Sequence, residues 1–358
     1  MAHRITISGY YGFGNTGDEA VLAGMLKTFR QTGLDADVTV LSCNPSDTAA
    51  GHPGVSSVHR YALPSVLRAL RRADLVISGG GSLLQDVTSA RSIRYYLFVL
   101  RAAQALRQKT MVYAQGVGPL IRPGSRRAVA AVLNKTNLVT GRDSESAELL
   151  KSIGVKKPPV LVTADPAFVL EPDPAEADRA LADLGLSGGP TVGVSLRPWK
   201  ATVDWPAEAA AGIRMACDKI GARVLVIPMQ PESDSCLWPN AREGEAVIAS
   251  TLDPGTVKGI IGRCGLMVGM RLHSLIFAAG EGVPFVPISY DPKVSAFASA
   301  AGARAIDIDG LNARTLADRI VEEWSRRDAA RERLLTWREE MRTLALRSGI
   351  LAKELLDE

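Results

Sequence analysis

The chain has 358 residues, of which 46% are hydrophobic and 22% charged, and its formal net charge is +4. This composition is typical of a globular protein with two domains. The small charge and the scarcity of aromatic residues exclude a nucleic-acid-binding platform but suit an anionic substrate. The four cysteines lack metal-type spacing, and no secretory leader or membrane-spanning segment is recognisable. These features predict a cytoplasmic protein with reduced thiols.

Short apolar runs alternate with helical patterns along the first half of the chain. Strands are expected at 5–8, 37–42, 74–78, 110–114 and 138–140, and helices at 18–32 and 92–107. The pattern restarts with strands at 191–196, 223–228, 265–269 and 284–289. This alternation predicts an α/β fold of two tandem Rossmann-like domains, with parallel sheets that face a central cleft. The expected parts are domains 1–170 and 191–327, a linker 171–190, and a charged amphipathic helix 328–358.

A Gly-x-Gly-x-x-Gly sequence, Gly12 to Gly17, follows the first strand. A dinucleotide-binding loop would also need an acid at the end of the second strand, which instead ends in Ser42-Cys43-Asn44. We therefore expect a loop that lets the backbone approach a sugar or phosphate. Asn15, Asp18 and Glu19 are the expected polar groups at the cleft floor, and Gly14 is a further candidate for contact with the acceptor. The alternative for Asp18 is a cap on the first helix.

Two further glycine-rich segments, 79–82 and 115–118, also follow strands. Their glycines, Gly80 among them, either allow close approach to a ligand or form tight turns without ligand contact. Gln85 and Asp86 come shortly after the first of these segments and are candidates for hydrogen bonds to an acceptor sugar.

Three charged residues follow other expected strands. Arg142 can hold a carboxylate or phosphate in bidentate fashion, or form an ion pair with Asp143. Asp165 is either a catalytic carboxylate or a structural turn-former. Arg197 follows the first strand of the second half and is a further candidate ligand for an anion.

The most informative segment is Gly269 to Ser274, which lies between an apolar strand and an apolar helix. It places Arg271 and His273 where the helix begins, and backbone N–H groups and the helix dipole favour an anion there. The titration range of histidine also suits acid–base chemistry. The other three histidines lack metal-like partners, so no metal site is expected. This segment predicts a phosphate-recognising active site in the second half of the chain.

At these residues the chain resembles the polysaccharide pyruvyltransferase family, in particular the bacterial cell-wall-polymer type called CsaB. The resembling stretches run in order over about residues 5–295 and are Gly9–Ala20, Ser78–Asp86, Tyr113–Pro119, Gly141–Asp143, Asp165–Phe168 and Met270–Ser274. The resemblance implies a GT-B-like fold, phosphoenolpyruvate as the donor, and a pair of sugar hydroxyls as the acceptor. The implied product is a cyclic pyruvate ketal, often on N-acetylmannosamine of a lipid-linked cell-wall polymer precursor.

The family's donor site maps onto Arg142, Arg271, Leu272 and His273, without departure at any of the four positions. The expected chemistry has His273 as general acid or phosphate partner and the arginines neutralising the donor, with Asp165 or Asp18 activating the acceptor. The first domain would bind the acceptor and the second the donor. Phosphoenolpyruvate is a co-substrate in this scheme, which needs no metal or other cofactor.

Three other functions compete with this interpretation. A nucleotide-sugar glycosyltransferase of the same fold commonly has a Glu in the helix after the Gly269–Ser274 segment, but Ser274 to Gly280 contains no acid. A non-catalytic anion-binding protein has no need for two arginines and a histidine at strand ends, and an oxidoreductase lacks its ribose-binding acid. The sequence leaves open the acceptor, the oligomeric state, and whether the exposed face of the C-terminal helix rests on the inner face of the membrane.

Overall fold

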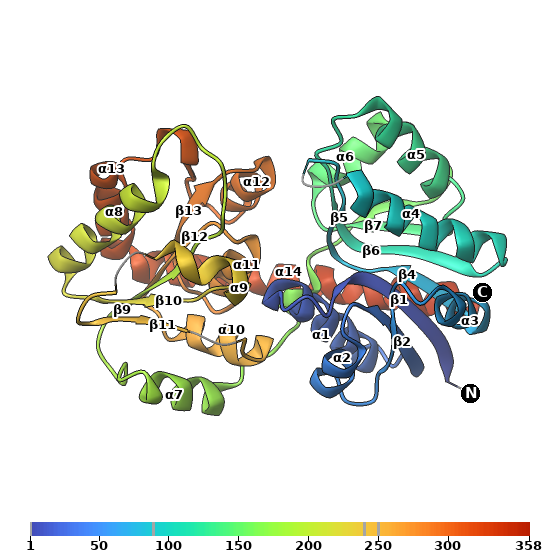
Figure 1. Ribbon diagram of the computed structural model, residues 1–358, viewed down its shortest axis with the longest axis horizontal. Helices are drawn as coiled ribbons and strands as arrows, with labels where there is room; N and C mark the ends of the chain where they lie inside the picture. The colour runs from blue at the N-terminus through green and yellow to red at the C-terminus, as the bar shows by residue number, and fades with distance from the viewer. Residues whose placement is uncertain (1, 88–89, 239–240, 249–250) are drawn as a thin grey trace. The chain divides into compact units, whose positions relative to one another are not determined.

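The computed structural model of the protein describes residues 2–87, 90–238, 241–248 and 251–358 (Figure 1). The chain forms two compact units. The first consists of Met1–Leu170 together with Met341–Glu358, and the second of Glu171–Glu340. Each unit contains one parallel sheet flanked by helices, which confirms the predicted α/β fold with two parallel sheets.

The first sheet has the strand order β3-β2-β1-β4-β6-β7-β8, and β5 pairs with β6. The strands are β1 (His3–Tyr11), β2 (Ala36–Ser42), β3 (Ser56–His59), β4 (Leu75–Ser78), β5 (Gly81–Leu84), β6 (Lys109–Val117), β7 (Leu138–Gly141) and β8 (Val160–Val162). Central strands such as β4 are buried along their whole length because helices cover both faces of a parallel sheet. This explains why their sequences are continuous apolar runs.

The helices of the first unit cover the two faces of its sheet. They are α1 (Thr16–Gln31), α2 (Pro45–Gly51), α3 (Leu63–Arg72), α4 (Ala90–Ala105), α5 (Pro123–Leu133), α6 (Ser144–Ser152) and the end of α14 (Arg327–Asp357). α1 and α14 pack on one set of sheet residues, including Ile7 and Ile77. α3, α4 and α5 pack on the alternate set, including Val76 and Val112, and therefore on the opposite face.

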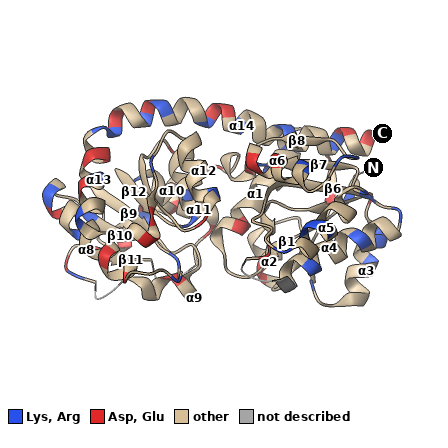
Figure 2. Ribbon diagram, turned by 90° about the horizontal axis from the view of Figure 1, so that it is seen from above, with Lys and Arg blue, Asp and Glu red and all other residues tan. Residues whose placement is uncertain are grey.

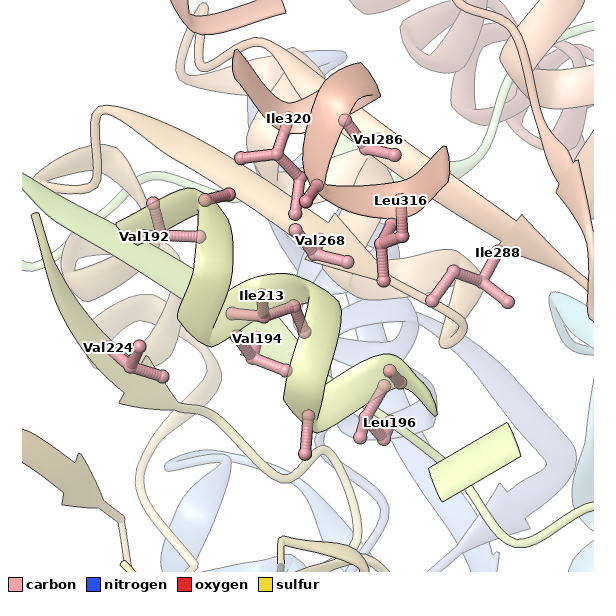
Figure 3. Close-up of a cluster of buried hydrophobic side chains, with 14 of the residues drawn as sticks. Val192, Val194, Leu196, Ile213, Val224, Val268, Val286, Ile288, Leu316 and Ile320 are labelled. Atoms are coloured by element: carbon pink, nitrogen blue, oxygen red, sulfur yellow. The ribbon is translucent and has the colours of Figure 1, made fainter. Parts of the chain in front are cut away.

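The second sheet has the strand order β11-β10-β9-β12-β13-β14. Its strands are β9 (Thr191–Ser195), β10 (Arg223–Val226), β11 (Glu245–Val247), β12 (Leu266–Gly269), β13 (Phe285–Ser289) and β14 (Ile306–Asp307). The helices are α7 (Pro174–Asp183), α8 (Trp205–Ile220), α9 (Pro231–Asp234), α10 (Pro254–Gly262), α11 (Leu272–Gly280), α12 (Pro292–Ala300) and α13 (Ala313–Ser325). Ile213 of α8 and Leu316 of α13 pack on Val194, Val268 and their neighbours in the sheet (Figure 3).

The segment expected as a linker, 171–190, lies within the second unit. It contains α7, which packs on α10: the Asp173 N–H donates to the Gly255 carbonyl at 2.9 Å, and Ala177 lies close against Gly259. The segment therefore contributes to the packing of one unit.

The expected C-terminal helix is observed as α14, with Lys or Arg and Asp or Glu interspersed along its length (Figure 2). Its last part belongs to the first unit. Ala352 and Leu355 join the core that contains α1, and Ser348 Oγ donates to Thr163 Oγ1 at 2.9 Å. A Cβ on Gly349 would lie 2.4 Å from Thr28 of α1, so this glycine allows close helix packing.

Candidate functional site

The glycine-rich loop between β1 and α1 is held mainly by its own polar side chains. Asn15 caps α1 by accepting a hydrogen bond from the Gly17 N–H at 3.0 Å, so the alternative that Asp18 is the cap is wrong. Glu19 accepts from the Gly12 N–H at 2.8 Å and lies 3.3 Å from His52 Nε2. Asn15 and Glu19 therefore stabilise the conformation of the loop. Gly14 is exposed, with a φ of 65° and open space around it.

The β1–α1 loop meets the turn that follows β4. Asp18 is half-buried, and its Oδ1 lies 2.9 Å from where a Cβ on Gly81 would be. Gly80 is buried, and a Cβ there would lie 2.6 Å from Val21 of α1. Gly80 was a candidate for close approach to a ligand, but packing against α1 explains the glycine at this position. Asp18 lies at the edge where the strands of the sheet end.

Gln85 and Asp86 have partners within the fold. Gln85 Oε1 accepts from the Val87 N–H at 2.9 Å. Asp86 is 3% exposed, and its carboxylate accepts from the N–H groups of Ile121 and Arg122 at 2.7 and 2.9 Å. Burial opposes ionisation, but these hydrogen bonds outweigh it and lower the pKa of Asp86 below its usual range. Asp86 thus holds the loop between β6 and α5.

We expect Asp86→Asn to lower the free energy of unfolding by about 1–3 kcal/mol near neutral pH, because an amide supplies one acceptor where the carboxylate supplies two. Since the folded-state pKa is lowered, the carboxylate's contribution is complete above the unfolded-state pKa of about 3.9. It is lost as the pH falls through the folded-state pKa. Denaturant titrations of both proteins from neutral pH downward should therefore show the difference shrinking in acid. A difference that stays constant would contradict this role.

Arg142 and Asp165 form a buried ion pair at the ends of β7 and β8. The Arg142 side chain is 5% exposed, and its Nη1 donates to Asp165 Oδ2 at 3.2 Å. Its Nη2 donates to Ser82 at 3.0 Å, and its Nε lies 3.5 Å from Asp143. Asp165 also accepts from the Ala167 N–H at 3.0 Å, which caps a short 3-10 helix. Asp165 is therefore a turn-former that also orients Arg142.

Gly116 in β6 makes room for the Arg142 guanidinium, since a Cβ there would lie 2.6 Å from Arg142 Nη2. We expect Gly116→Ala to displace this guanidinium. If Arg142 binds the donor, as the resemblance implies, catalytic efficiency should fall at least tenfold, because a small misplacement of a binding group is costly. Gly124→Ala in the first turn of α5 is the matched control. Its Cβ meets nothing within 4 Å, so activity should not change. Equal activity of the two variants in steady-state assays would argue against a role for Arg142.

The sequence did not identify a buried arginine among aromatic rings in the same unit. Arg60 is 4% exposed and donates to the Gly9 carbonyl at 3.0 Å. Its guanidinium lies 4.1 Å from the centroid of Tyr95 and 5.2 Å from that of Phe13, which stacks on Tyr10. Such contacts are favourable for a cation that is removed from water. The paired aromatics Tyr10-Tyr11 and Tyr95-Tyr96 were the available signal in the sequence.

In the second unit, Arg271 is oriented by a carboxylate that was not predicted. Arg271 Nε and Nη2 donate to Asp234 at 2.9 and 2.5 Å, and the Asp234 side chain is only 1% exposed. Nη2 also lies near Gln230 and Ser233. Among the described residues, Nη1 of Arg271 makes no hydrogen bond. The bidentate pair thus fixes the guanidinium and leaves one nitrogen for a ligand.

Arg271, Leu272 and His273 begin α11 as predicted. Arg271 occupies the N-cap position without capping the helix through its side chain, Leu272 is buried, and His273 is half-buried in the first turn. Ser274 Oγ donates to the Arg271 carbonyl at 2.6 Å. A helix start of this kind presents backbone N–H groups and a positive dipole end to an anion.

Arg197 lies at the same edge of the second sheet. β9 ends at Ser195, which pairs with Gly269 at the end of β12. Arg197 donates to the Tyr290 hydroxyl at 2.8 Å. Within the described residues, the buried Arg197 Nε and Ser195 Oγ have no hydrogen-bond partner. Buried polar atoms without partners are rare, and a polar ligand would satisfy them.

The structure thus brings the predicted residues together in two groups, each at the edge where the parallel strands end. The first unit contributes Asp18, Arg142 and Asp165, and the second contributes Arg197, Arg271, Leu272 and His273. In open α/β sheets this edge is where ligands bind.

Solved structures similar to this one share its fold at low sequence identity. UDP-GlcNAc 2-epimerase from Neisseria meningitidis bound to UDP-GlcNAc has a TM-score of 0.64 and 10% identity, with all of each chain covered. A glycosyltransferase from Rickettsia africae has a TM-score of 0.62 and 11% identity, covering 100% of this chain and 99% of the other. Anabaena Alr3699/HepE in complex with UDP has a TM-score of 0.64 and 12% identity over 99% of each chain. These likenesses establish a GT-B-like fold.

Sequence comparison identifies the family. The amylovoran biosynthesis protein AmsJ of Erwinia amylovora is 21% identical, covering 81% of this chain and 84% of the relative. The family model described as polysaccharide pyruvyl transferase matches residues 15–292. This range contains the residues of both groups at the strand-end edges. The chain therefore belongs to the polysaccharide pyruvyl transferase family.

Proposed function

We propose that this pyruvyl transferase takes its pyruvyl group from phosphoenolpyruvate and forms a cyclic ketal with two hydroxyls of a sugar. The single observation that carries the donor assignment is that Arg271 and His273 both lie at the start of α11. Phosphoenolpyruvate has a phosphate and a carboxylate, and this site combines a helix N-terminus with an oriented arginine.

The donor site would use groups that the fold leaves available. The phosphate accepts from the first backbone N–H groups of α11, including that of Leu272, and from Arg271 Nη1. Arg197 Nε and Ser195 Oγ are buried polar atoms that make no hydrogen bond within the described part of the chain, and they would donate to the same ligand. In the first unit we assign donor binding to Arg142. Its nitrogens contact Asp165, Ser82 and Asp143, and its remaining N–H groups would donate to the ligand.

The reaction begins with protonation of the methylene carbon of phosphoenolpyruvate, for which His273 is the proposed acid. The central carbon becomes cationic, and one sugar hydroxyl oxygen bonds to it and releases its proton. The carbon–oxygen bond to phosphate then breaks, phosphate leaves, and the second hydroxyl closes the ring with loss of its proton. Charged groups that are already oriented stabilise these changes with little reorganisation.

Asp18 is the proposed base for the acceptor. Both oxygens of Asp165 are engaged, by Arg142 and the Ala167 N–H, so we assign Asp165 to positioning. Asp18 is half-buried beside Gly81, at the edge where the exposed Gly14 leaves space for a sugar. Asn15 and Gln85 would act on the acceptor through the loops that they stabilise.

The acceptor that we propose is N-acetylmannosamine in a lipid-linked cell-wall polymer precursor, as in the CsaB type. The relative AmsJ is instead named for amylovoran biosynthesis. Acceptor preference depends on loops, which vary more readily than the sheets that carry them. The assay therefore needs several sugars.

The test incubates the purified protein with phosphoenolpyruvate and β-linked N-acetylmannosamine, glucose or galactose acceptors. Phosphate release and the mass gain of the sugar are followed together. Both should occur with at least one acceptor and disappear in His273→Ala, while Lys157→Ala, an exposed site in the first unit, remains active. Turnover of a nucleotide-sugar in place of phosphoenolpyruvate would retain the fold but overturn the donor assignment.

A further inference from the structure

The charge of the chain is distributed very unevenly along its sequence. Between residues 48 and 142 there are fourteen Lys and Arg but only two acids, Asp74 and Asp86, although the net charge of the whole chain is only +4. This segment includes α3, α4 and α5, which cover one face of the first sheet. A local excess of this size on a nearly neutral chain indicates an anionic partner for that face.

The outer side of these three helices is basic. We call it the basic face, and its exposed cations are Arg68, Arg71, Arg72, Arg94, Arg101, Arg122, Arg126, Arg127 and Lys135. Within the described ranges, none of these side chains lies within ion-pair distance of an acid. Figure 2 shows Lys and Arg on these helices. Close ion pairs therefore do not neutralise the positive charge of the cations named here.

Large apolar side chains are exposed on the same face. Leu63 and Leu67 of α3 are 50% and 38% exposed, Phe98 of α4 is 44% exposed, and Ile121 before α5 is 66% exposed. Exposed apolar side chains beside arginines are typical of segments that rest in the interface of a bilayer. A nucleic acid would gain little from burying leucine, isoleucine and phenylalanine.

Grooves between α4 and α5 combine the same two properties. One of about 490 Å³ has Leu97 and Val132 among its apolar lining, together with Arg101 and Lys135. A second, of about 290 Å³, shares Leu97 and includes Arg94. An apolar lining with neighbouring cations suits an amphiphile with an anionic headgroup.

We propose that the basic face docks on a membrane surface rich in anionic phospholipids. Leu63 is the first residue of α3, and Ile121 comes shortly before α5. Both helices begin at the edge where the strands of the first sheet end. Docking through this face would bring the acceptor loops of that edge to the bilayer. The docking itself does not depend on the reaction, but its use in presenting a lipid-linked acceptor rests on the proposed function.

The test is sedimentation of the full-length protein with vesicles of phosphatidylcholine alone or of equal parts phosphatidylcholine and phosphatidylglycerol. We expect binding to the anionic vesicles only, weakening as salt is added. The variant Arg94→Gln/Arg101→Gln/Arg127→Gln should bind about 100-fold more weakly, because each cation near an anionic surface contributes separately. Phe98→Ser/Ile121→Ser should also weaken binding.

The matched control is Arg30→Gln/Arg314→Gln/Arg347→Gln, which removes three exposed cations from other helices and should bind like the wild type. Circular dichroism melting confirms that the variants are folded. Absence of binding to anionic vesicles, equal loss in both triple variants, or binding of RNA in preference to vesicles would overturn the proposal. Vesicle binding without pyruvyl transfer would leave this inference standing and reject the proposed function, and transfer to a soluble acceptor without vesicle binding would do the reverse.

Discussion

Arg271→Ala is expected to reduce kcat/KM about 10²–10³-fold, the loss that is typical when one oriented donor is removed from a reacting oxyanion. It should also lower the free energy of unfolding by about 3–5 kcal/mol, because the buried Asp234 carboxylate loses its counter-charge. Steady-state kinetics with phosphoenolpyruvate and denaturant unfolding measure the two effects separately.

A double variant distinguishes the two roles of this arginine. Arg271→Met/Asp234→Leu removes both charges and should regain most of the lost stability, since apolar residues of similar size often replace a buried ion pair without cost. It should remain inactive, because stability does not restore a donor for the phosphate. Activity in the double variant, or in Arg271→Ala, would show that Arg271 only supports the fold.

Arg142→Met is expected to have effects of similar size in the first unit. Asp165, which is 3% exposed, would be left without a cation, and the free energy of unfolding should fall by about 3–5 kcal/mol. The KM for phosphoenolpyruvate should rise about 100-fold if Arg142 binds the donor. Thermal unfolding and initial-rate measurements test these results.

Two further variants serve as controls for Arg142. Arg30→Met removes an exposed cation from the end of α1 and should change stability by less than about 0.5 kcal/mol. Arg142→Met/Asp165→Asn neutralises the stranded carboxylate and should recover part of the stability while the KM stays high. Recovery of a normal KM in this double variant would mean that Arg142 merely neutralises Asp165.

The sequence predicted the layout of both sheets because buried parallel strands are short continuous apolar runs. Strands β4, β9 and β12 are of this kind and were expected within one or two residues of their observed bounds. β3 and β14 were not predicted, since short edge strands carry little apolar signal. The packing of the end of α14 on the first unit was also not predicted, because an amphipathic pattern does not indicate which sheet a helix packs against.

The positions of candidate residues were predictable where they follow a clear strand–helix pattern, as for Arg271, which lies at a helix start as expected. The role of a residue was not predictable where it serves the fold, because Gly80 and Asp86 follow a strand in the same way as a ligand-binding residue would. Asp234 was missed because it lies in the four-residue helix α9, which has no recognisable pattern. Only the fold brings it to Arg271.

The C-terminal end of α14 has a consequence for the order of folding during synthesis. Residues 341–358 complete the core of the first unit, where Ala352 and Leu355 pack with α1. The first half of the chain leaves the ribosome long before this segment is made, and domains generally begin to fold as they emerge. The core of the first unit therefore stays incomplete, with part of the apolar surface of α1 uncovered, until residues 341–358 have been synthesised. A chain that is truncated near residue 340 would keep that surface exposed and become a substrate for chaperones and proteases.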